Sequence, residues 1–214
     1  MMNVHQQPHA IDQRIQPLAS YGVVLMSMGF LSPGDKPLVW RGPMLHNVIQ
    51  QFLRQVDWGT LDYLVIDLPP GTGDVQLSLI QTAPLSGAVV VTTPSDVSLE
   101  DARKAVNMFQ QVKVPVLGLV ENMSYLMVPG TGQKIDVFGS GGGKRTAEKM
   151  SIPFLGELAL DPDVRVGGDS GRPVTIYGES DGRAKPFFEL ARNVVNQVDA
   201  MAAQAQGPSI SIAD

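Results

Sequence analysis

The feature that most constrains the fold is a regular alternation of short apolar runs with amphipathic segments. The apolar runs are 22–28, 61–67, 87–93, 114–122 and 153–160, and in several of them apolar residues stand at consecutive rather than alternating positions. Consecutive apolar residues are typical of strands that are buried on both faces, as in a parallel sheet. These runs are therefore predicted to be the strands of one parallel sheet.

Amphipathic segments separate the runs. In 43–56 apolar residues recur every three or four positions and form one stripe, and Pro43 suits the first turn of a helix. The other predicted helices are 74–82, 98–112, 143–150 and 184–201. This alternation predicts an α/β fold, a three-layer, doubly wound and mostly parallel sheet with right-handed crossovers. We expect one domain over residues 1–201 and a flexible tail over 202–214.

Composition excludes several classes of function. The chain has 214 residues with 16 Lys+Arg against 21 Asp+Glu, so it lacks the basic footprint of a nucleic-acid-binding protein. It contains no cysteine, which excludes disulfides, Cys-ligated zinc, a thiol nucleophile and a self-ligated iron–sulfur cluster. No apolar run is long enough to span a bilayer, and the first residues lack a signal-peptide pattern. We expect a cytoplasmic protein that binds neither nucleic acid nor membrane.

The strongest chemical signal is the segment 67–74, DLPPGTGD, which follows an apolar run and precedes a predicted helix. In open α/β sheets, ligands bind outside the carboxyl ends of the strands. Asp67 offers the hard oxygen that Mg²⁺ and its bound water prefer, and Gly71 and Gly73 let backbone amides approach an anion. The alternative is a tight turn that is merely rich in proline and glycine.

Two further polar residues follow apolar runs. Asn122 follows one run and Asp161 another, so both are expected at the same carboxyl edge of the sheet as Asp67. The alternatives are a turn-forming asparagine at 122 and a simple loop at 161–163.

The string DLPPGTGDVQLSL resembles the switch II region of the Mrp/ApbC group of deviant P-loop ATPases, relatives of MinD and ParA. The resemblance covers roughly residues 20 to 195, with similar stretches in the same order: SMGFL, VWRGPM, VDWGTLDYLVIDLPPGTGD, GAVVVTTPSDVSLEDARKAVNMF, VLGLVENMSY, FGSGGG and PFLGELALDPDVR. It implies an ATPase that uses ATP and Mg²⁺ in iron–sulfur cluster assembly or transfer. It also implies a homodimer that works with iron–sulfur client or scaffold proteins.

The resemblance assigns the phosphate side of a nucleotide site to the switch II segment. Asp67 corresponds to the catalytic residue that acts near Mg²⁺ and the attacking water. The amide of Gly71 corresponds to the one that contacts the terminal phosphate. Pro70, which stiffens the same loop, is counted with the cofactor-binding residues.

The resemblance assigns the base side of that site to two later segments. Asn122 corresponds to the asparagine of the V-E-N motif, which helps to recognise adenine. Asp161 and Pro162 lie in the loop that follows the last core strand, which also lines the base.

The phosphate-binding motif itself, G-x-x-x-x-G-K-[ST], does not occur in this sequence. The nearest string, GSGGGKRT at 139–146, fails to match it, and is either a helix cap or a weak anion site. In the family the P-loop precedes the segment that matches Tyr21. We therefore expect these residues to be the C-terminal part of a longer protein and to bind Mg-ATP poorly on their own.

Many family members carry a Cys-x-x-Cys pair after the ENMSY motif, where two subunits share a [4Fe–4S] cluster. Here the corresponding run is 126–132, whose only sulfur belongs to Met127, and a thioether does not replace a thiolate at such a cluster. Cluster binding by this chain is therefore in doubt. One alternative is a non-catalytic dimerisation or interaction module, or a fragment. A weaker alternative is a MinD/ParA-like positioning ATPase, which the lack of Lys and Arg in 202–214 disfavours.

Overall fold

The computed structural model describes residues 1–31, 42–68, 74–128 and 130–205. The chain forms two compact units, each of which is described by itself. Unit 1 comprises Met1–Pro84 and Arg165–Ile176, and unit 2 comprises Leu85–Val164 and Tyr177–Asp214. Whether residues 1–201 act as one domain stays a prediction.

Unit 2 is built on a parallel sheet. Its strands are β5 (Ala88–Thr92), β6 (Val116–Glu121) and β9 (Phe154–Glu157), in the order β5-β6-β9. Every residue of the central strand β6 is buried, as its consecutive apolar residues predict. Three of the five predicted strands, 87–93, 114–122 and 153–160, are therefore confirmed.

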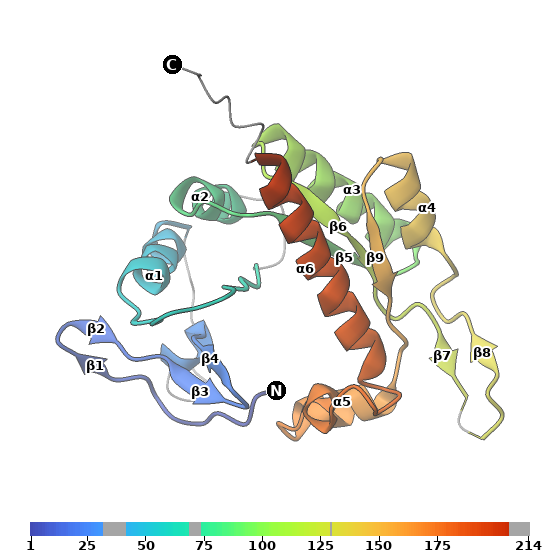
Figure 1. Ribbon diagram of the computed structural model, residues 1–214, viewed down its shortest axis with the longest axis horizontal. Helices are drawn as coiled ribbons and strands as arrows, with labels where there is room; N and C mark the ends of the chain where they lie inside the picture. Colours follow the sequence, from blue (N-terminus) through green and yellow to red (C-terminus); the bar gives the residue numbers. More distant parts are fainter. Residues whose placement is uncertain (32–41, 69–73, 129, 206–214) are drawn as a thin grey trace, which may run out of the picture. The chain divides into compact units, whose positions relative to one another are not determined.

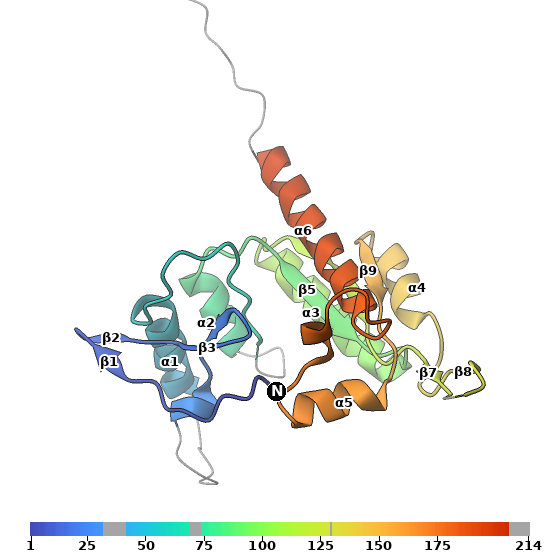
Figure 2. The same ribbon diagram turned by 60° about the horizontal axis from the view of Figure 1, so that its bottom comes forward.

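Helices cover both faces of this sheet (Figures 1 and 2). Helices α3 (Asp96–Gln111) and α4 (Gly142–Lys149) pack together on one face, and α6 (Lys185–Ala205) packs on the other against β9 and β6. The core under α6 consists of Val120, Leu155 and Leu158 with Phe187, Leu190 and Val194. The predicted three-layer α/β fold is thus present in unit 2.

A hairpin follows β6, and a further helix follows β9. A hairpin of β7 (Leu126–Met127) and β8 (Lys134–Ile135) follows β6, and Lys134 Nζ lies 3.8 Å from the ring centre of Tyr125. Helix α5 (Pro162–Asp169) follows β9 and leads to a 3₁₀ turn, η2 (Val174–Tyr177), and the stretch Arg165–Ile176 belongs to unit 1.

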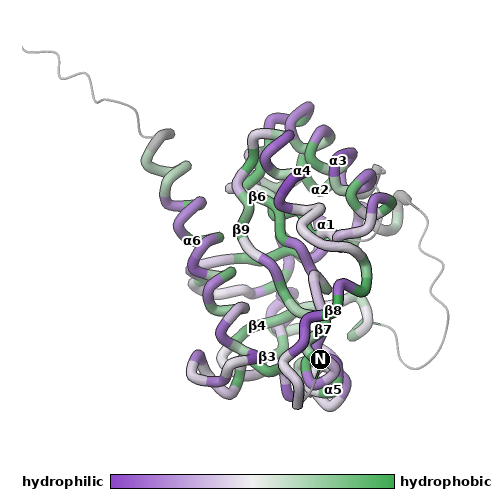
Figure 3. Tube along the Cα trace, turned by 90° about the vertical axis from the view of Figure 1, so that its right-hand side faces the viewer, coloured by the Kyte–Doolittle hydropathy of each residue, from purple (hydrophilic) through white to green (hydrophobic). Residues whose placement is uncertain are grey.

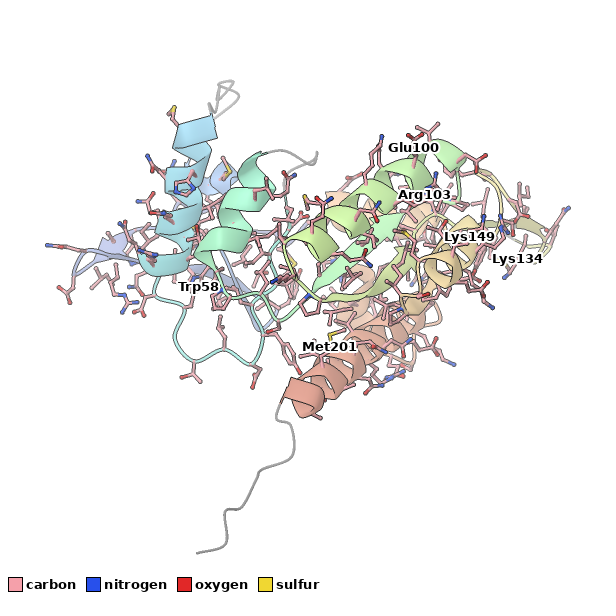
Figure 4. All side chains as sticks on the ribbon, turned by 90° about the horizontal axis from the view of Figure 1, so that it is seen from above. Trp58, Glu100, Arg103, Lys134, Lys149 and Met201 are labelled. Atoms are coloured by element: carbon pink, nitrogen blue, oxygen red, sulfur yellow. The ribbon has the colours of Figure 1, made fainter. Side chains whose placement is uncertain are left out.

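Among its described residues, the part of unit 1 within Met1–Pro84 contains short strands and two helices. The hairpins pair β1 (Ala10–Ile11) with β2 (Arg14–Ile15) and β3 (Leu18–Ser20) with β4 (Val23–Leu25). A 3₁₀ turn, η1 (Met28–Leu31), and the helices α1 (Gly42–Arg54) and α2 (Asp74–Thr82) follow, and the two helices pack on each other. Beyond α1, Trp58 Nε1 donates a hydrogen bond of 2.8 Å to the carbonyl of Phe52 (Figure 4).

The prediction of a buried parallel strand over 22–28 is wrong. Strand β4 covers Val23–Leu25 and pairs antiparallel with β3. The cause is the two-residue turn Tyr21-Gly22, in which both residues have positive φ (51° and 77°), the geometry that closes a tight hairpin.

The predicted strand 61–67 is also not found among the described residues. Three of its apolar side chains are exposed: Tyr63 is 54%, Leu64 45% and Val65 90% accessible. Among the described residues, none of the named strands pairs with this segment.

The bounds of the predicted helices agree with those of α1, α2, α3, α4 and α6 within two residues, except at the C-terminal end of α6. There the helix continues from Met201 to Ala205 through alanine and glutamine, both good helix formers. Figure 3 shows α6 as a mixture of hydrophilic and hydrophobic residues, as expected of a helix with one buried face. Among the described helices, none is both long and apolar enough to cross a bilayer.

Candidate functional site

The carboxyl ends of the three parallel strands form one edge of unit 2. Asn122 follows β6 directly, and its backbone N–H donates to the carbonyl of Thr92, the last residue of β5, at 2.7 Å. Asn122 therefore lies between the ends of two neighbouring strands, at the edge where open α/β sheets bind ligands.

The side-chain amide of Asn122 is half-buried and has one end free. Its Oδ1 accepts the backbone N–H of Met123 at 3.0 Å, which fixes the amide orientation. No hydrogen bond from its Nδ2 occurs within the described part of the chain. The donor end of the amide is thus available to a ligand, and the second lone pair of Oδ1 remains as an acceptor.

The chain after β9 runs beside the chain after β6. The N–H of Leu158 donates to the carbonyl of Glu121 at 2.8 Å, and the N–H of Leu160 donates to that of Tyr125 at 2.8 Å. These two bonds extend the contact between the strands beyond their ends. They bring Asp161, four residues past β9, to the same edge of unit 2.

Asp161 and Pro162 begin helix α5. Oδ1 of Asp161 accepts the backbone N–H of Asp163 at 2.8 Å, and Pro162 occupies the first helical position. An aspartate before the helix and a proline at its start are the favoured residues there. The carboxylate of Asp161 therefore caps helix α5, whether or not it also contacts a ligand.

An arginine joins the start of α5 to the start of α6. Arg183 Nη1 donates to Asp163 Oδ2 at 2.9 Å, and its Nη2 donates to Asp181 Oδ2 at 2.8 Å. The side-chain hydrogen bonds of Arg183 lower the pKa of Asp181 to about 2 and raise the pKa of Arg183 itself. The arginine thus stabilises the ionised form of Asp181 beside the predicted base-side loop.

The predicted phosphate side is described only in part. Asp67 belongs to unit 1, is exposed, and makes no hydrogen bond or ion pair within the described part of the chain. Pro70 and Gly71 lie outside the described residues. The roles of all three residues therefore stay predictions.

A buried carboxylate, which was not predicted from the sequence, lies next to Asn122 in the chain. The side chain of Glu121 is fully buried; its Oε2 accepts the backbone N–H of Gly143, and its Oε1 accepts the hydroxyl of Ser124 at 2.8 Å. The signal that could have revealed it is the single charged residue inside the apolar run 114–122.

The contact of Glu121 with Gly143 also bears on the two alternatives for the glycine-rich segment 139–146, a helix cap or an anion site. Gly143 lies in the first turn of α4, where unpaired amides and the helix dipole attract negative charge. The protein's own carboxylate takes that position. This contact favours the helix-cap alternative, because the amide of Gly143 is already bound within the protein.

The run 126–132, where the resemblance places a cysteine pair, contains β7 and the turn of the β7–β8 hairpin. Met127 on this hairpin is 42% exposed. Over the described ranges, no group of three or more His, Asp or Glu side chains is arranged to hold a metal ion.

Two shallow cavities lie elsewhere. One, of about 250 Å³, lies between β9 and α6 and is lined in part by Tyr125, Glu157, Glu189 and Asn193. The other, of about 420 Å³, follows the amide-rich face of α1. Neither is lined by a predicted site residue.

The family model described as ParA, NUBPL iron-transfer P-loop NTPase, matches residues 1–195. An iron-sulfur cluster carrier protein of Deinococcus radiodurans is 50% identical over 187 residues, which is 87% of this chain and 53% of that protein. The iron-sulfur cluster transfer protein NUBPL of Dictyostelium discoideum is 46% identical over 197 residues, 91% of this chain and 61% of that protein. The chain thus spans between half and two thirds of the length of these relatives.

Solved structures agree on the fold. A nucleotide-binding protein of Archaeoglobus fulgidus in complex with ADP matches with a TM-score of 0.67 and 37% identity, over 80% of this chain and 67% of that one. The cell division ATPase MinD of Pyrococcus furiosus matches with a TM-score of 0.51 and 24% identity, over 71% of this chain and 57% of that one. At that identity the MinD likeness supports the fold alone.

Proposed function

Because the chain belongs to the NUBPL iron-transfer group of ParA-type P-loop NTPases, we propose that it is an ATP-using carrier in iron–sulfur cluster assembly or transfer. The observation that carries the proposal is the family match over residues 1–195. The names of the Deinococcus and Dictyostelium relatives and the ADP in the Archaeoglobus structure point the same way.

In this proposal Asn122 recognises the adenine base. An asparagine amide can accept a hydrogen bond from N6 of adenine with its oxygen and donate one to N7 with its nitrogen. The free Nδ2 and the remaining lone pair of Oδ1 fit that pattern. Asp161 and Pro162, at the same edge, line the base from the turn into α5.

Asp67 is proposed to act on the phosphate side. Its exposed carboxylate is the hard oxygen donor that suits Mg²⁺, which when bound neutralises charge on the transferred phosphate. The same carboxylate orients the attacking water. Pro70 and Gly71 complete the switch II contact to the terminal phosphate, as the resemblance implies. A P-loop of the G-x-x-x-x-G-K-[ST] type, which these residues do not contain, completes the site.

The iron–sulfur cluster is proposed as cargo. With no cysteine in the chain, its own residues do not fit the thiolate ligation that such clusters need. The proposal therefore assigns the thiolates to a client or scaffold protein. It also includes a homodimer, the arrangement that the family resemblance implies.

Calorimetric titration of ADP, ATP and GTP with Mg²⁺ tests the nucleotide site. The titration uses the 214-residue chain and a second protein in which a family P-loop segment precedes it, with the Archaeoglobus relative as the positive control. We expect weak but adenine-selective binding by the chain, and at least tenfold tighter binding by the extended protein. If the extended protein binds no ATP, the ATPase proposal is wrong.

Two variants separate the proposed roles. Asp67→Asn is expected to slow ATP hydrolysis at least a hundredfold while ADP binding is kept, because only the metal and water contacts change. Asn122→Ala is expected to lower the preference for ATP over GTP about tenfold or more, the value of one bidentate base contact.

Cluster transfer is measured separately, as the recovery of activity of an apo-enzyme mixed with a cluster-loaded scaffold protein and this chain, with and without Mg-ATP.

A second candidate function is a non-catalytic interaction module. It is favoured by the group of exposed apolar side chains on and after the β7–β8 hairpin, namely Met127, Ile135, Val137 and Phe138. This candidate predicts a dimer without nucleotide. Light scattering that finds a monomer at all concentrations would count against it.

A further inference from the structure

Glu121 lies beside the proposed adenine contact but faces the interior. Its side chain has no exposed surface, and it precedes Asn122 at the end of β6. A buried carboxylate is costly unless hydrogen bonds compensate for its lost hydration. Its two oxygens meet that need with different partners, the amide of Gly143 and the hydroxyl of Ser124.

One partner belongs to the turn after β6 and the other to helix α4. Ser124 lies two residues after it, and its hydroxyl is also 3.1 Å from the carbonyl of Glu121. Gly143 is the second residue of α4, which packs on β6. The carboxylate therefore connects the turn 121–124 to the start of a helix that is anchored on the sheet.

The turn that Glu121 holds is under strain. Met123 has φ of +55°, a left-handed conformation that a bulky side chain adopts only when its surroundings enforce it. The backbone N–H of Ser124 bonds to Leu158 at 2.9 Å, and that of Asn122 bonds to Thr92 at 2.7 Å. The direction of the Asn122 side chain depends on this turn.

We infer that Glu121 is a positioning residue, which fixes the turn 122–124 from inside the fold and so aims the amide of Asn122 at the nucleotide base. The functional half of this inference rests on the proposed function. The structural half rests only on the bonds of Glu121 to Gly143 and Ser124.

Two substitutions at this position differ in what they preserve. In Glu121→Gln the amide oxygen can accept the N–H of Gly143, and the amide nitrogen can donate to Oγ of Ser124. The Ser124 hydroxyl hydrogen then turns to the Glu121 carbonyl, which is already within reach. Glu121→Ala removes both acceptors. Glu121→Gln should therefore keep the hydrogen bonds to Gly143 and Ser124 that Glu121→Ala loses.

The control for general destabilisation is Val120→Ala. Val120 is the neighbouring residue of β6, is 2% exposed, and packs in the core under α6 rather than against Glu121. Its truncation should weaken unit 2 without altering the turn.

Hydrogen exchange of the 214-residue chain, read amide by amide by NMR, tests the structural half. In Glu121→Ala we expect protection of the Asn122, Ser124 and Gly143 amides to fall at least tenfold relative to the β6 amides. In Glu121→Gln and Val120→Ala these ratios should stay within about twofold of the unsubstituted chain. Unchanged ratios in Glu121→Ala would overturn the inference.

Titration of ADP and GDP into the same variants tests the functional half. Glu121→Ala should lose the preference for ADP, as Asn122→Ala does, while Glu121→Gln and Val120→Ala should keep it. Lost protection with an unchanged preference would overturn the positioning role. If the unsubstituted chain shows no preference, the base contact proposed for Asn122 fails, and the exchange data still decide whether Glu121 fixes the turn.

Discussion

A methyl group on Gly143 would lie 2.9 Å from Oε2 of Glu121 and 3.0 Å from its Cβ. Atoms that belong to real side chains do not approach so closely, so the helix start and the strand end could not both keep their places. The distance between α4 and β6 is therefore set by the absence of a side chain at this position.

Gly143→Ala should destabilise the protein, although alanine is the better helix former by about 1 kcal/mol. We expect a net loss of about 1–3 kcal/mol, because overpacking against the buried carboxylate outweighs propensity. The matched control is Gly168→Ala in α5, where the nearest atom is the flexible Met1 side chain at 3.5 Å. Urea unfolding should find that control neutral or stabilised, and a stabilised Gly143→Ala would contradict the close contact.

Asp161→Ala should destabilise α5 by about 1 kcal/mol, since it removes the acceptor for the Asp163 amide. Asp161→Asn should change the stability by a few tenths of a kcal/mol, because asparagine caps helices as well as aspartate does. Thermal unfolding of the two variants gives the comparison. Equal losses in both would show that the charge, not the cap, is what matters there.

Arg183→Gln should raise the pKa of Asp181 from about 2 toward its ordinary value near 3.8. A depressed carboxyl pKa stabilises the fold above the unfolded pKa, and the stabilisation is lost as the pH falls through the folded pKa. The stability difference between the two proteins should therefore be full above about pH 4 and disappear toward pH 2.

NMR titration of the side-chain carboxyl carbons measures this shift directly. The control is Arg192→Gln, which removes the guanidinium that lowers the pKa of Glu179. It should raise the pKa of Glu179 and leave Asp181 where it is. A shift of Asp181 in the control would show that long-range charge, rather than the Arg183 hydrogen bonds, sets its pKa.

Val65→Ala should change the free energy of unfolding by no more than about 0.5 kcal/mol, because this side chain is 90% exposed. Val56→Ala, at a position that is 1% exposed in the same unit, should cost about 2 kcal/mol. Chemical unfolding of both variants decides whether 61–67 is the buried strand that its sequence predicts. A cost at Val65 equal to that at Val56 would favour the strand.

The sequence predicts unit 2 well because local and tertiary signals agree there. The runs that became β5, β6 and β9 are apolar at consecutive positions and lie next to one another in a covered sheet. In 61–67 the same signal fails, since a strand also needs a partner, and the described residues supply none. The apolar pattern of a segment indicates which side chains it can bury, but it does not show whether another strand lies beside it.

In the candidate site, too, some features could be predicted from the sequence and others could not. The position of Asn122 follows from its place after β6, because the carboxyl ends of parallel strands share an edge. The task of Asp161 as a helix cap and the network of Glu121 could not be predicted, since they depend on contacts between residues far apart in the sequence. Glu121 and Gly143, for example, are 22 residues apart.

The glycines at the start of α4 have a consequence for how relatives of this chain are compared. A Cβ on Gly142 would lie 2.6 Å from the carbonyl oxygen of Pro94, and one on Gly143 would meet Glu121. Selection for folding alone would thus keep both positions free of side chains over long evolutionary times. Invariant glycines here, however widely shared among related sequences, would record a packing constraint and would not by themselves reveal a bound phosphate.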